Sequence, residues 1–330
     1  MRVLADSGFS GVVLVARGNT ILLHRSYDHK GFSADTSMAF FLASNSKQFT
    51  ATAILRLQEQ GKLSVHDRIT RFFAKVPPDK KGITIHHLLT HASGIGNNYI
   101  SEGITDRSEM VRQVLSRPLE QPIGKEYAYT SDGYNLLGAI IEIASGMTFE
   151  KYLTTYLLKP AGLHHTGFWG FQSEVPVRIA PVLDSVRSKP LYQKAFRNDT
   201  TYANWGMRGA GGMFSTAIDL FHWVRAIQGR RVIADSSRQQ MWAPHVLIRQ
   251  ASLVDVYSGY GWIVSTTKDG KLVETRHSGR EDWMANSWIR VFRNGDLVIA
   301  LAYDFGPDAD AMSVMAAKEL VLMLKQHSRQ

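Results

Sequence analysis

Ser44 and Lys47 are the two residues of this sequence whose types and spacing most clearly allow chemistry. They form an S-x-x-K run, and residues at i and i+3 share one face of a helix, so the lysine can reach the serine hydroxyl. The start of a helix also stabilises negative charge developing on the serine. A lysine whose pKa is lowered by burial or by nearby cations can act as the base for such a serine. A lone S-x-x-K more often marks a capping serine followed by a solvated lysine, so the surrounding sequence has to decide.

Other familiar catalytic patterns are absent. The chain has no cysteine, which excludes a thiolate nucleophile, a disulfide and cysteine-based metal sites. It has no G-x-S-x-G elbow, no H-E-x-x-H pair, no P-loop and no G-x-G-x-x-G. His87 and His91 stand four residues apart beside His86, but no carboxylate at suitable spacing completes a metal shell. We therefore predict neither a cofactor nor a metal.

Composition narrows the class of partner. The chain has 330 residues and a net charge of +9, but its basic residues are scattered, and the densest groups are the pairs Lys80-Lys81 and Arg230-Arg231. This is not the footprint of a nucleic-acid-binding protein. The longest early apolar run, residues 12–16, is too short for a signal sequence or a membrane span. We expect a small-molecule substrate, no nucleic acid and no membrane span. The oligomeric state and the compartment, cytoplasmic or secreted after processing, stay open.

The elements that would position Ser44 and Lys47 fall into two groups. Strand patterns gather at the two ends of the chain, whereas helical periodicity dominates the middle. The predicted hairpins pair residues 9–17 with 20–25, 260–266 with 272–277, and 286–293 with 296–303. Predicted helices cover residues 49–60, 109–115, 133–145, 149–157, 216–227 and 308–326.

Isolated hairpins are marginal in water, so the strands at both ends must join in one sheet. We predict an α+β fold, with an antiparallel sheet flanked by helices plus an all-helical domain. The sheet domain is discontinuous, built from residues 1–67 and 246–330, and residues 68–245 form the mainly helical domain.

Several ordered blocks along the chain accompany S-x-x-K and decide between its two interpretations. The blocks are Phe9-Ser10-Gly11, Ala43-Ser44-Asn45-Ser46-Lys47, Gly61-Lys62-Leu63-Ser64-Val65-His66-Asp67, Leu88-Leu89-Thr90-His91-Ala92-Ser93-Gly94, Tyr129-Thr130-Ser131-Asp132-Gly133-Tyr134, Gly211-Gly212-Met213-Phe214-Ser215-Thr216, Gly259-Tyr260-Gly261-Trp262 and His277-Ser278-Gly279. With these blocks in this order, the chain resembles the serine β-lactamase and penicillin-binding-protein superfamily, especially its class C-like and family VIII carboxylesterase branches, for which S-x-x-K is a signature. The resemblance covers nearly the whole chain and implies a β-lactamase/DD-peptidase-like fold.

The resemblance implies a role for each matching residue. Ser44 would be the acylated nucleophile, Lys47 its proton-transfer partner, and Tyr129 a general base or relay. A phenol has an ordinary pKa near 10, so it would need two neighbouring cations, Lys47 and a protonated His277. The oxyanion hole would be formed by the backbone N–H groups of Ser44 and Arg280.

The sequence departs from the family pattern at the substrate-binding positions. Ser131 replaces the asparagine of Y-x-N, and His277-Ser278-Gly279 stands where many relatives have lysine-threonine-glycine. Arg280 follows at a position that is often small, and it either projects into the cleft or points to solvent. No counterpart of the class A deacylating glutamate is evident.

These departures rank the candidate functions. The family's asparagine helps to hold the amide side of a β-lactam or peptide, so its loss favours small carboxylic esters. The alternatives are a D-amino-acid peptidase, a DD-carboxypeptidase or a weak β-lactamase. A catalytically silent binding domain of the same fold is a further alternative, although it would have no reason to retain Ser44, Lys47 and Tyr129 together.

Overall fold

The computed structural model describes residues 9–28, 35–168, 182–183, 190–191, 204–281 and 285–304. Its strands are β1 Ser10–Arg17, β2 Thr20–Tyr27, β3 Ala39–Phe41, β4 Gly167–Phe168, β5 Val182–Leu183, β6 Pro190–Leu191, β7 Met213–Thr216, β8 Val246–Gln250, β9 Val254–Ser258, β10 Ile263–Thr267, β11 Leu272–Glu281, β12 Ala285–Phe292 and β13 Leu297–Asp304. Its helices are η1 Ala43–Ser46, α2 Lys47–Glu59, η2 Ile69–Arg71, η3 Pro78–Lys80, α3 Ile85–Leu89, α4 Arg107–Ser116, α5 Ser131–Ser145, α6 Phe149–Leu153, η4 Thr154–Leu158, α7 Lys159–Ala161, α9 Trp205–Arg208, α10 Ala217–Gln228 and α11 Asp235–Met241.

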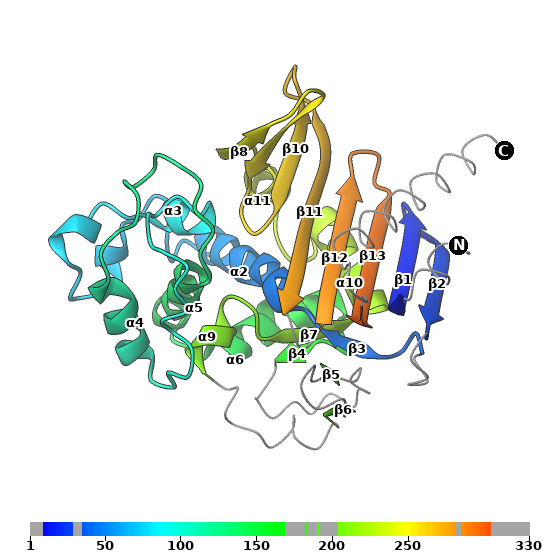
Figure 1. Cartoon of the computed structure of the whole chain (residues 1–330), viewed down its shortest axis with the longest axis horizontal. Helices are drawn as coiled ribbons and strands as arrows, with labels where there is room; N and C mark the ends of the chain where they lie inside the picture. The colour runs from blue at the N-terminus through cyan, green and yellow to red at the C-terminus, as the bar shows by residue number, and fades with distance from the viewer. Residues whose placement is uncertain are drawn as a thin grey trace.

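The two ends of the chain build one antiparallel sheet, as predicted. Its strand order is β2-β1-β13-β12-β11-β10-β9-β8. Strand β1, near the start of the sequence, therefore pairs with β13, near its end (Figure 1). Glycines with positive φ lie in all three predicted hairpin turns, at Gly18, Gly270 and Gly295. Such a backbone conformation is accessible to glycine at little cost, which explains why these residues end the strands.

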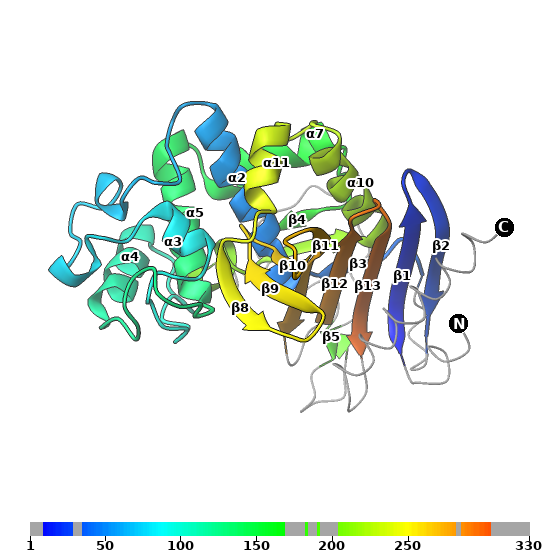
Figure 2. The same cartoon turned by 90° about the horizontal axis from the view of Figure 1, so that it is seen from above.

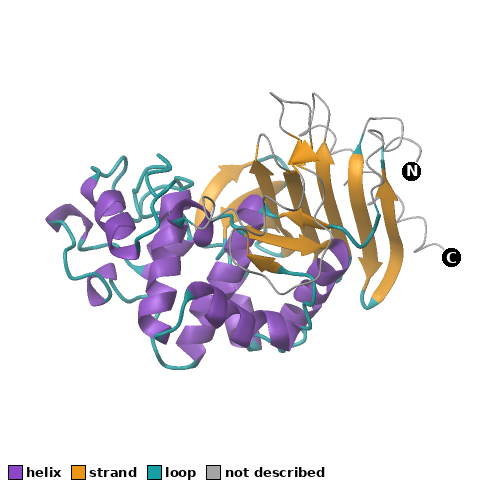
Figure 3. Ribbon diagram, turned by 90° about the horizontal axis from the view of Figure 1, so that it is seen from below, coloured by secondary structure: helices purple, strands orange, loops and turns teal. Residues whose placement is uncertain are grey.

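Helices cover the sheet and extend beyond it. Helix α2 lies between the sheet and the group formed by α3, α4 and α5 (Figures 1 and 2). Helix α10 packs against β1 and β13. On α2, the ring of Phe49 stacks on Trp223 of α10 at 4.1 Å, which joins the two helices in the buried core. Seen from below, strands and helices segregate into two regions (Figure 3). The predicted α+β class is therefore confirmed.

Long-range pairing accounts for the strands that periodicity did not predict. Strands β3, β7 and β4 form a small three-stranded sheet, and β8 and β9 extend the main sheet. Residues 260–262, predicted as strand, precede β10, and Gly261 has a φ of +70°. The helix predicted over 149–157 is divided into α6 and the π-helical η4.

The predicted domain limits, 1–67 with 246–330 and 68–245, stay a prediction. The helix predicted over 308–326 lies outside the described residues. Among the residues that the structure describes, no helix combines the length and the apolar character needed to cross a bilayer.

Candidate active site

Ser44 lies in a tight turn at the start of α2, a largely buried helix. The 3-10 turn η1 carries Ser44 and leads directly into α2 at Lys47. The lysine Nζ lies 3.1 Å from Ser44 Oγ, so the predicted i, i+3 contact is present. Ala43, just before the serine, has a φ of +45°. A non-glycine residue rarely adopts this left-handed conformation, and local backbone strain of this kind concentrates at functional sites.

Lys47 is completely buried and lacks a carboxylate partner within hydrogen-bonding distance among the described residues. Its Nζ donates to Ser44 Oγ, to Ser131 Oγ at 3.4 Å and to the main-chain oxygen of Ala210 at 2.8 Å. An ammonium group has three N–H donors, so these three neutral acceptors match it in number. The arrangement places an amine against the serine without an ion pair that would hold the positive charge there.

Tyr129 approaches the serine from the other side. Its hydroxyl lies 2.6 Å from Ser44 Oγ, and Lys47 Nζ lies 4.9 Å from the centre of its ring. The tyrosine directly precedes Thr130, whose side chain caps α5 by accepting a hydrogen bond from the N–H of Gly133. The helix start therefore fixes the backbone that carries the phenol. Ser44 now has two proton-exchanging neighbours, an amine and a phenol.

The strand that carries residues 277–280 lies beside this turn. The pairing of β10 with β11 ends at Arg276, so the rest of β11 has β12 on one side and η1 on the other. A side chain at Gly279 would bring a Cβ to 1.9 Å from the main-chain oxygen of Leu42. Only glycine allows this close approach. It brings the main chain of β11 next to Ser44, as the predicted oxyanion hole requires.

A buried polar chain, which the sequence did not indicate, joins the same elements. Asn45 donates to both the main-chain oxygen and the hydroxyl of Ser287 on β12, and Ser287 in turn donates to Leu42 O. On the other side, Gln48 donates to Asn45 Oδ1 and accepts from Trp223. Buried networks with satisfied partners rigidify their surroundings. This series of buried hydrogen bonds therefore fixes η1 against the sheet.

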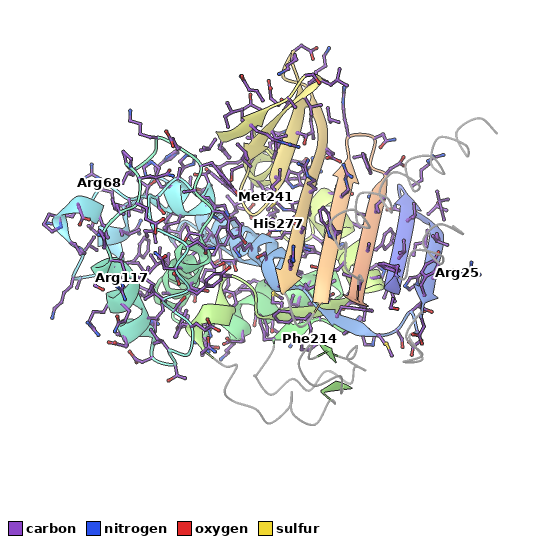
Figure 4. The ribbon with its side chains drawn as sticks, in the orientation of Figure 1. Arg25, Arg68, Arg117, Phe214, Met241 and His277 are labelled. Carbon is purple, nitrogen blue, oxygen red and sulfur yellow. The ribbon has the colours of Figure 1, made fainter. Side chains whose placement is uncertain are left out.

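His277 does not supply the second cation that the sequence analysis invoked. It lies on β11 at the boundary between the sheet and the helices (Figure 4) and is 7% exposed. Burial, and next the positive charge of Lys47, lower the pKa of His277 from its usual 6.5 to about 3. Its Nδ1 lies 2.7 Å from the oxygen of Ser278, to which it donates. The imidazole is therefore neutral at neutral pH and does not supply a positive charge beside Tyr129.

Acidification should destabilise the protein through this histidine. Between pH 6.5 and pH 3 the unfolded chain binds a proton at His277 that the folded protein excludes, so stability rises with pH across this window. Going from pH 7 to pH 5 should cost up to about 2 kcal/mol at this residue. The His277→Gln variant should lose less, as measured by urea unfolding at both pH values. Equal losses in the two proteins would contradict a neutral His277 in the native state.

A cavity of about 870 Å³ opens above these groups. Of the eight residues that the sequence analysis selected, six line it, Lys47 lies buried and Gly279 packs against Leu42. Arg280 is exposed and is one of the residues that line the cavity. The cavity lining also includes residues that the sequence analysis did not select for the site, among them His91, Tyr99, Glu102, Tyr127 and Trp262. They come from loops whose position depends on the tertiary structure. His91 and Trp262 stand in blocks that carry the family resemblance, whereas no motif marks the other three.

The histidines weighed as a metal pair have separate roles. Helix α3 ends at Leu89, so His91 is not on the helical face that carries His87. His87 Nδ1 accepts from the N–H of Thr84, and His91 Nδ1 accepts from the N–H of Thr130. Within the part of the chain that the structure describes, no group of three or more potential ligands could hold a metal ion.

The fold and this constellation of serine, lysine and tyrosine define a serine hydrolase. The Beta-lactamase family model matches residues 2–320, and the chain belongs to this family. Penicillin-binding protein 4* of Bacillus subtilis strain 168 is 29% identical over 336 residues, which is 95% of this chain and 72% of that protein. The chain spans less than two thirds of other curated relatives, for example 60% of PbpX from the same organism.

Solved structures share the fold. A penicillin-binding protein from Bacillus halodurans superposes with a TM-score of 0.79 at 24% identity, covering 96% of this chain and 98% of that one. The D-amino acid amidase from Ochrobactrum anthropi SV3 gives a TM-score of 0.76 at 19% identity, with 100% and 98% covered. At these identities the likeness concerns the fold.

Proposed function

We propose that this chain hydrolyses small carboxylic esters through an acyl-enzyme on Ser44. The observation that carries the proposal is the meeting of three groups at one cavity: the Ser44 hydroxyl, Lys47 Nζ at 3.1 Å and the Tyr129 hydroxyl at 2.6 Å. A nucleophile with a base within hydrogen-bond reach is the signature of covalent catalysis.

The first half of the reaction forms the acyl-enzyme. Ser44 Oγ bonds to the carbonyl carbon, and its proton passes to Tyr129 or Lys47, whichever is in its base form. The main-chain N–H groups of Ser44 and Arg280 would receive the negative charge of the tetrahedral intermediate. As the C–O bond to the alcohol breaks, the same proton is returned to the leaving oxygen. Water then attacks the acyl carbon and gives a proton to the base. As the bond between the acyl carbon and Ser44 Oγ breaks, the base returns this proton to Oγ and the acid is released.

Ser131 favours esters over amides. Its hydroxyl lies 3.4 Å from the buried Lys47 Nζ, and its main-chain N–H donates to Asn97. A serine at this position has neither the reach nor the paired donor and acceptor of an asparagine amide. An ester also needs less help than an amide, because its alcohol leaves more readily than an amine.

D-amino acid amides and peptides are the second candidate, and Glu102 is the observation in favour. Glu102 is in a loop that lines the cavity, and its negative charge would attract the free amino group of a substrate. Relatives are called penicillin-binding proteins, and a structure with the same fold is a D-amino acid amidase. Cephalosporin hydrolysis is a further alternative within the family.

A substrate panel separates these functions. We expect kcat/KM to be highest for short p-nitrophenyl esters, at least tenfold above D-alanine p-nitroanilide and a chromogenic cephalosporin, since a tenfold preference corresponds to only about 1.4 kcal/mol. An ester with a terminal carboxylate on its acyl chain, compared with its neutral analogue, probes the guanidinium of Arg280. Faster turnover of the anilide or the cephalosporin would reverse the preference for esters. Absence of turnover with all three would favour the silent binding domain.

A further inference from the structure

His91 holds the backbone on both sides of Tyr129, at Ala128 and at Thr130. Its main-chain oxygen accepts a hydrogen bond from the N–H of Ala128 at 2.7 Å. Its side-chain Nδ1 accepts a second one from the N–H of Thr130 at 3.1 Å. Residue 129 lies between these two bonds, so a single residue from a distant part of the sequence fixes the backbone on either side of the phenol.

The imidazole also packs on the phenol itself. The ring centres of His91 and Tyr129 are 4.5 Å apart with an angle of 30° between the planes. Only 5% of His91 is exposed, and it lines the same cavity as Ser44. This contact restricts the side-chain rotation of Tyr129, whose hydroxyl must stay within hydrogen-bond distance of Ser44 Oγ.

The backbone of His91 is shaped for these contacts. Helix α3 ends at Leu89, and His91 follows with a φ of +57°. Residues other than glycine rarely adopt this left-handed conformation, although Asn, Asp and His do so more often than most. Such conformations persist where the surrounding structure imposes them. The turn brings both the carbonyl and the ring of His91 to the segment that carries Tyr129.

The imidazole is neutral in this position. Burial, and then the positive charge of Lys47, lower the pKa of His91 well below its usual value. Because Nδ1 accepts a hydrogen bond, it carries no proton, and the acceptor persists at neutral pH. The titratable groups that face the ring are Lys47, His277, Tyr127, Tyr129 and Tyr134.

We propose that His91 is the positioning residue for Tyr129: by accepting hydrogen bonds from the N–H groups of Ala128 and Thr130, it holds the phenol hydroxyl at Ser44 for proton transfer. This inference rests on the proposed function, because it assigns a task within the reaction of Ser44. Reacting groups that are misplaced by about 1 Å can lose on the order of 10²-fold in rate, so such a task is measurable.

Two substitutions at His91 distinguish the effect of its hydrogen-bond acceptor, Nδ1, from the effect of its aromatic ring. In His91→Asn, the amide Oδ1 takes the position of Nδ1, and asparagine tolerates a positive φ. This variant should label with a fluorophosphonate at Ser44 within about threefold of the unmodified protein, because the bond from Thr130 is retained. In His91→Phe, a ring remains but the acceptor is lost. Its labelling rate should fall at least about tenfold, since the freed N–H lets residue 129 move.

A double-mutant cycle removes the ambiguity of a folding effect. Introducing His91→Phe into Tyr129→Phe should change the residual labelling rate less than about threefold, since no hydroxyl remains to be positioned. Thermal unfolding of all four proteins confirms that they are folded. If His91→Phe slows labelling equally in both backgrounds, or if His91→Asn is slowed as much as His91→Phe, the inference is wrong.

The failure of this inference is distinguishable from that of the proposed function. Labelling of the unmodified protein tests the function alone, because it needs Ser44 to react and does not depend on the natural substrate. Rapid labelling with no effect of His91→Phe overturns the positioning role and leaves the nucleophile in place. No labelling of the unmodified protein overturns both.

Discussion

The Ser44→Ala variant should take up no fluorophosphonate and should lose ester turnover by about 10⁴- to 10⁶-fold, the range seen when a hydrolase loses its nucleophile. The loss is expected to be this large because the remaining groups can bind the substrate but none replaces the Ser44 hydroxyl as the atom that is acylated. Lys47 keeps two of its three acceptors, Ser131 Oγ and Ala210 O, so the amine remains in place. Intact-protein mass spectrometry after labelling, with an ester assay on the same sample, measures both losses.

Ser258→Ala is the matched control for this prediction. Ser258 lines the same cavity, but its hydroxyl donates to the main-chain oxygen of Gly259. This contact gives Ser258 no role in the proposed proton transfer. The control should label at the rate of the unmodified protein. An adduct on Ser44→Ala of the mass expected for one label would identify a different nucleophile and refute the assignment of Ser44.

The meeting of Ser44, Lys47 and Tyr129 could be predicted because its signals are local or ordered along the chain. Helical spacing alone brings Lys47 to Ser44, and alternation with turn residues located the strands at both ends. The position of Tyr129 required a resemblance, since nothing in 85 residues of separation shows that its hydroxyl lies 2.6 Å from Ser44. The general rule is that spacing predicts contacts within an element, whereas contacts between elements need the fold.

The parts of the site that the sequence analysis missed depend on long-range packing. Asn45 is only an intervening residue of S-x-x-K in the sequence, yet its amide reaches Ser287 on β12, 242 positions away. For His91, the spacing along the sequence suggested a contact that the fold does not make. Its spacing from His87 suggested a possible metal pair, but the end of α3 at Leu89 takes it off that helix and directs it to Thr130.

Electrostatics could not be predicted from residue types either. The sequence analysis treated His277 as a titrating replacement for a lysine, with an ordinary pKa near 6.5. In the folded protein its burial removes the charge, and the nearby amine of Lys47 acts in the same direction. A residue type gives the unperturbed pKa, whereas the desolvation that shifts it depends on where the fold places the side chain.

Replacing Tyr129 with phenylalanine should lower ester turnover by about 10²- to 10⁴-fold, the usual contribution of a general acid or base. The substitution removes one oxygen and keeps the ring that packs on His91 and lies 4.9 Å from Lys47 Nζ. The loss should therefore appear in kcat more than in KM, because the groups that line the cavity stay in place. Steady-state kinetics with a p-nitrophenyl ester measures the two separately.

Tyr127→Phe provides a closely matched control for this variant. Tyr127 lines the same cavity and also packs on His91, but among the described residues the hydrogen bonds to Ser44 Oγ come from Lys47 and Tyr129. Burial raises the pKa of the Tyr127 phenol well above the usual value. A phenol shifted in this direction is a poor base at neutral pH, so its removal should change kcat by less than about threefold. A large loss in Tyr127→Phe would show that the cavity responds to any missing hydroxyl.

The step that slows in Tyr129→Phe identifies what the phenol does. If Tyr129 takes the proton from Ser44, the variant should form the acyl-enzyme slowly and show no burst of p-nitrophenol. If it mainly activates water, acylation should stay fast, a burst of one equivalent should precede slow turnover, and mass spectrometry should detect the trapped acyl-enzyme. Retention of more than about a third of the activity would contradict both roles. Lys47, the other group within reach of Ser44 Oγ, would then have to carry the proton alone.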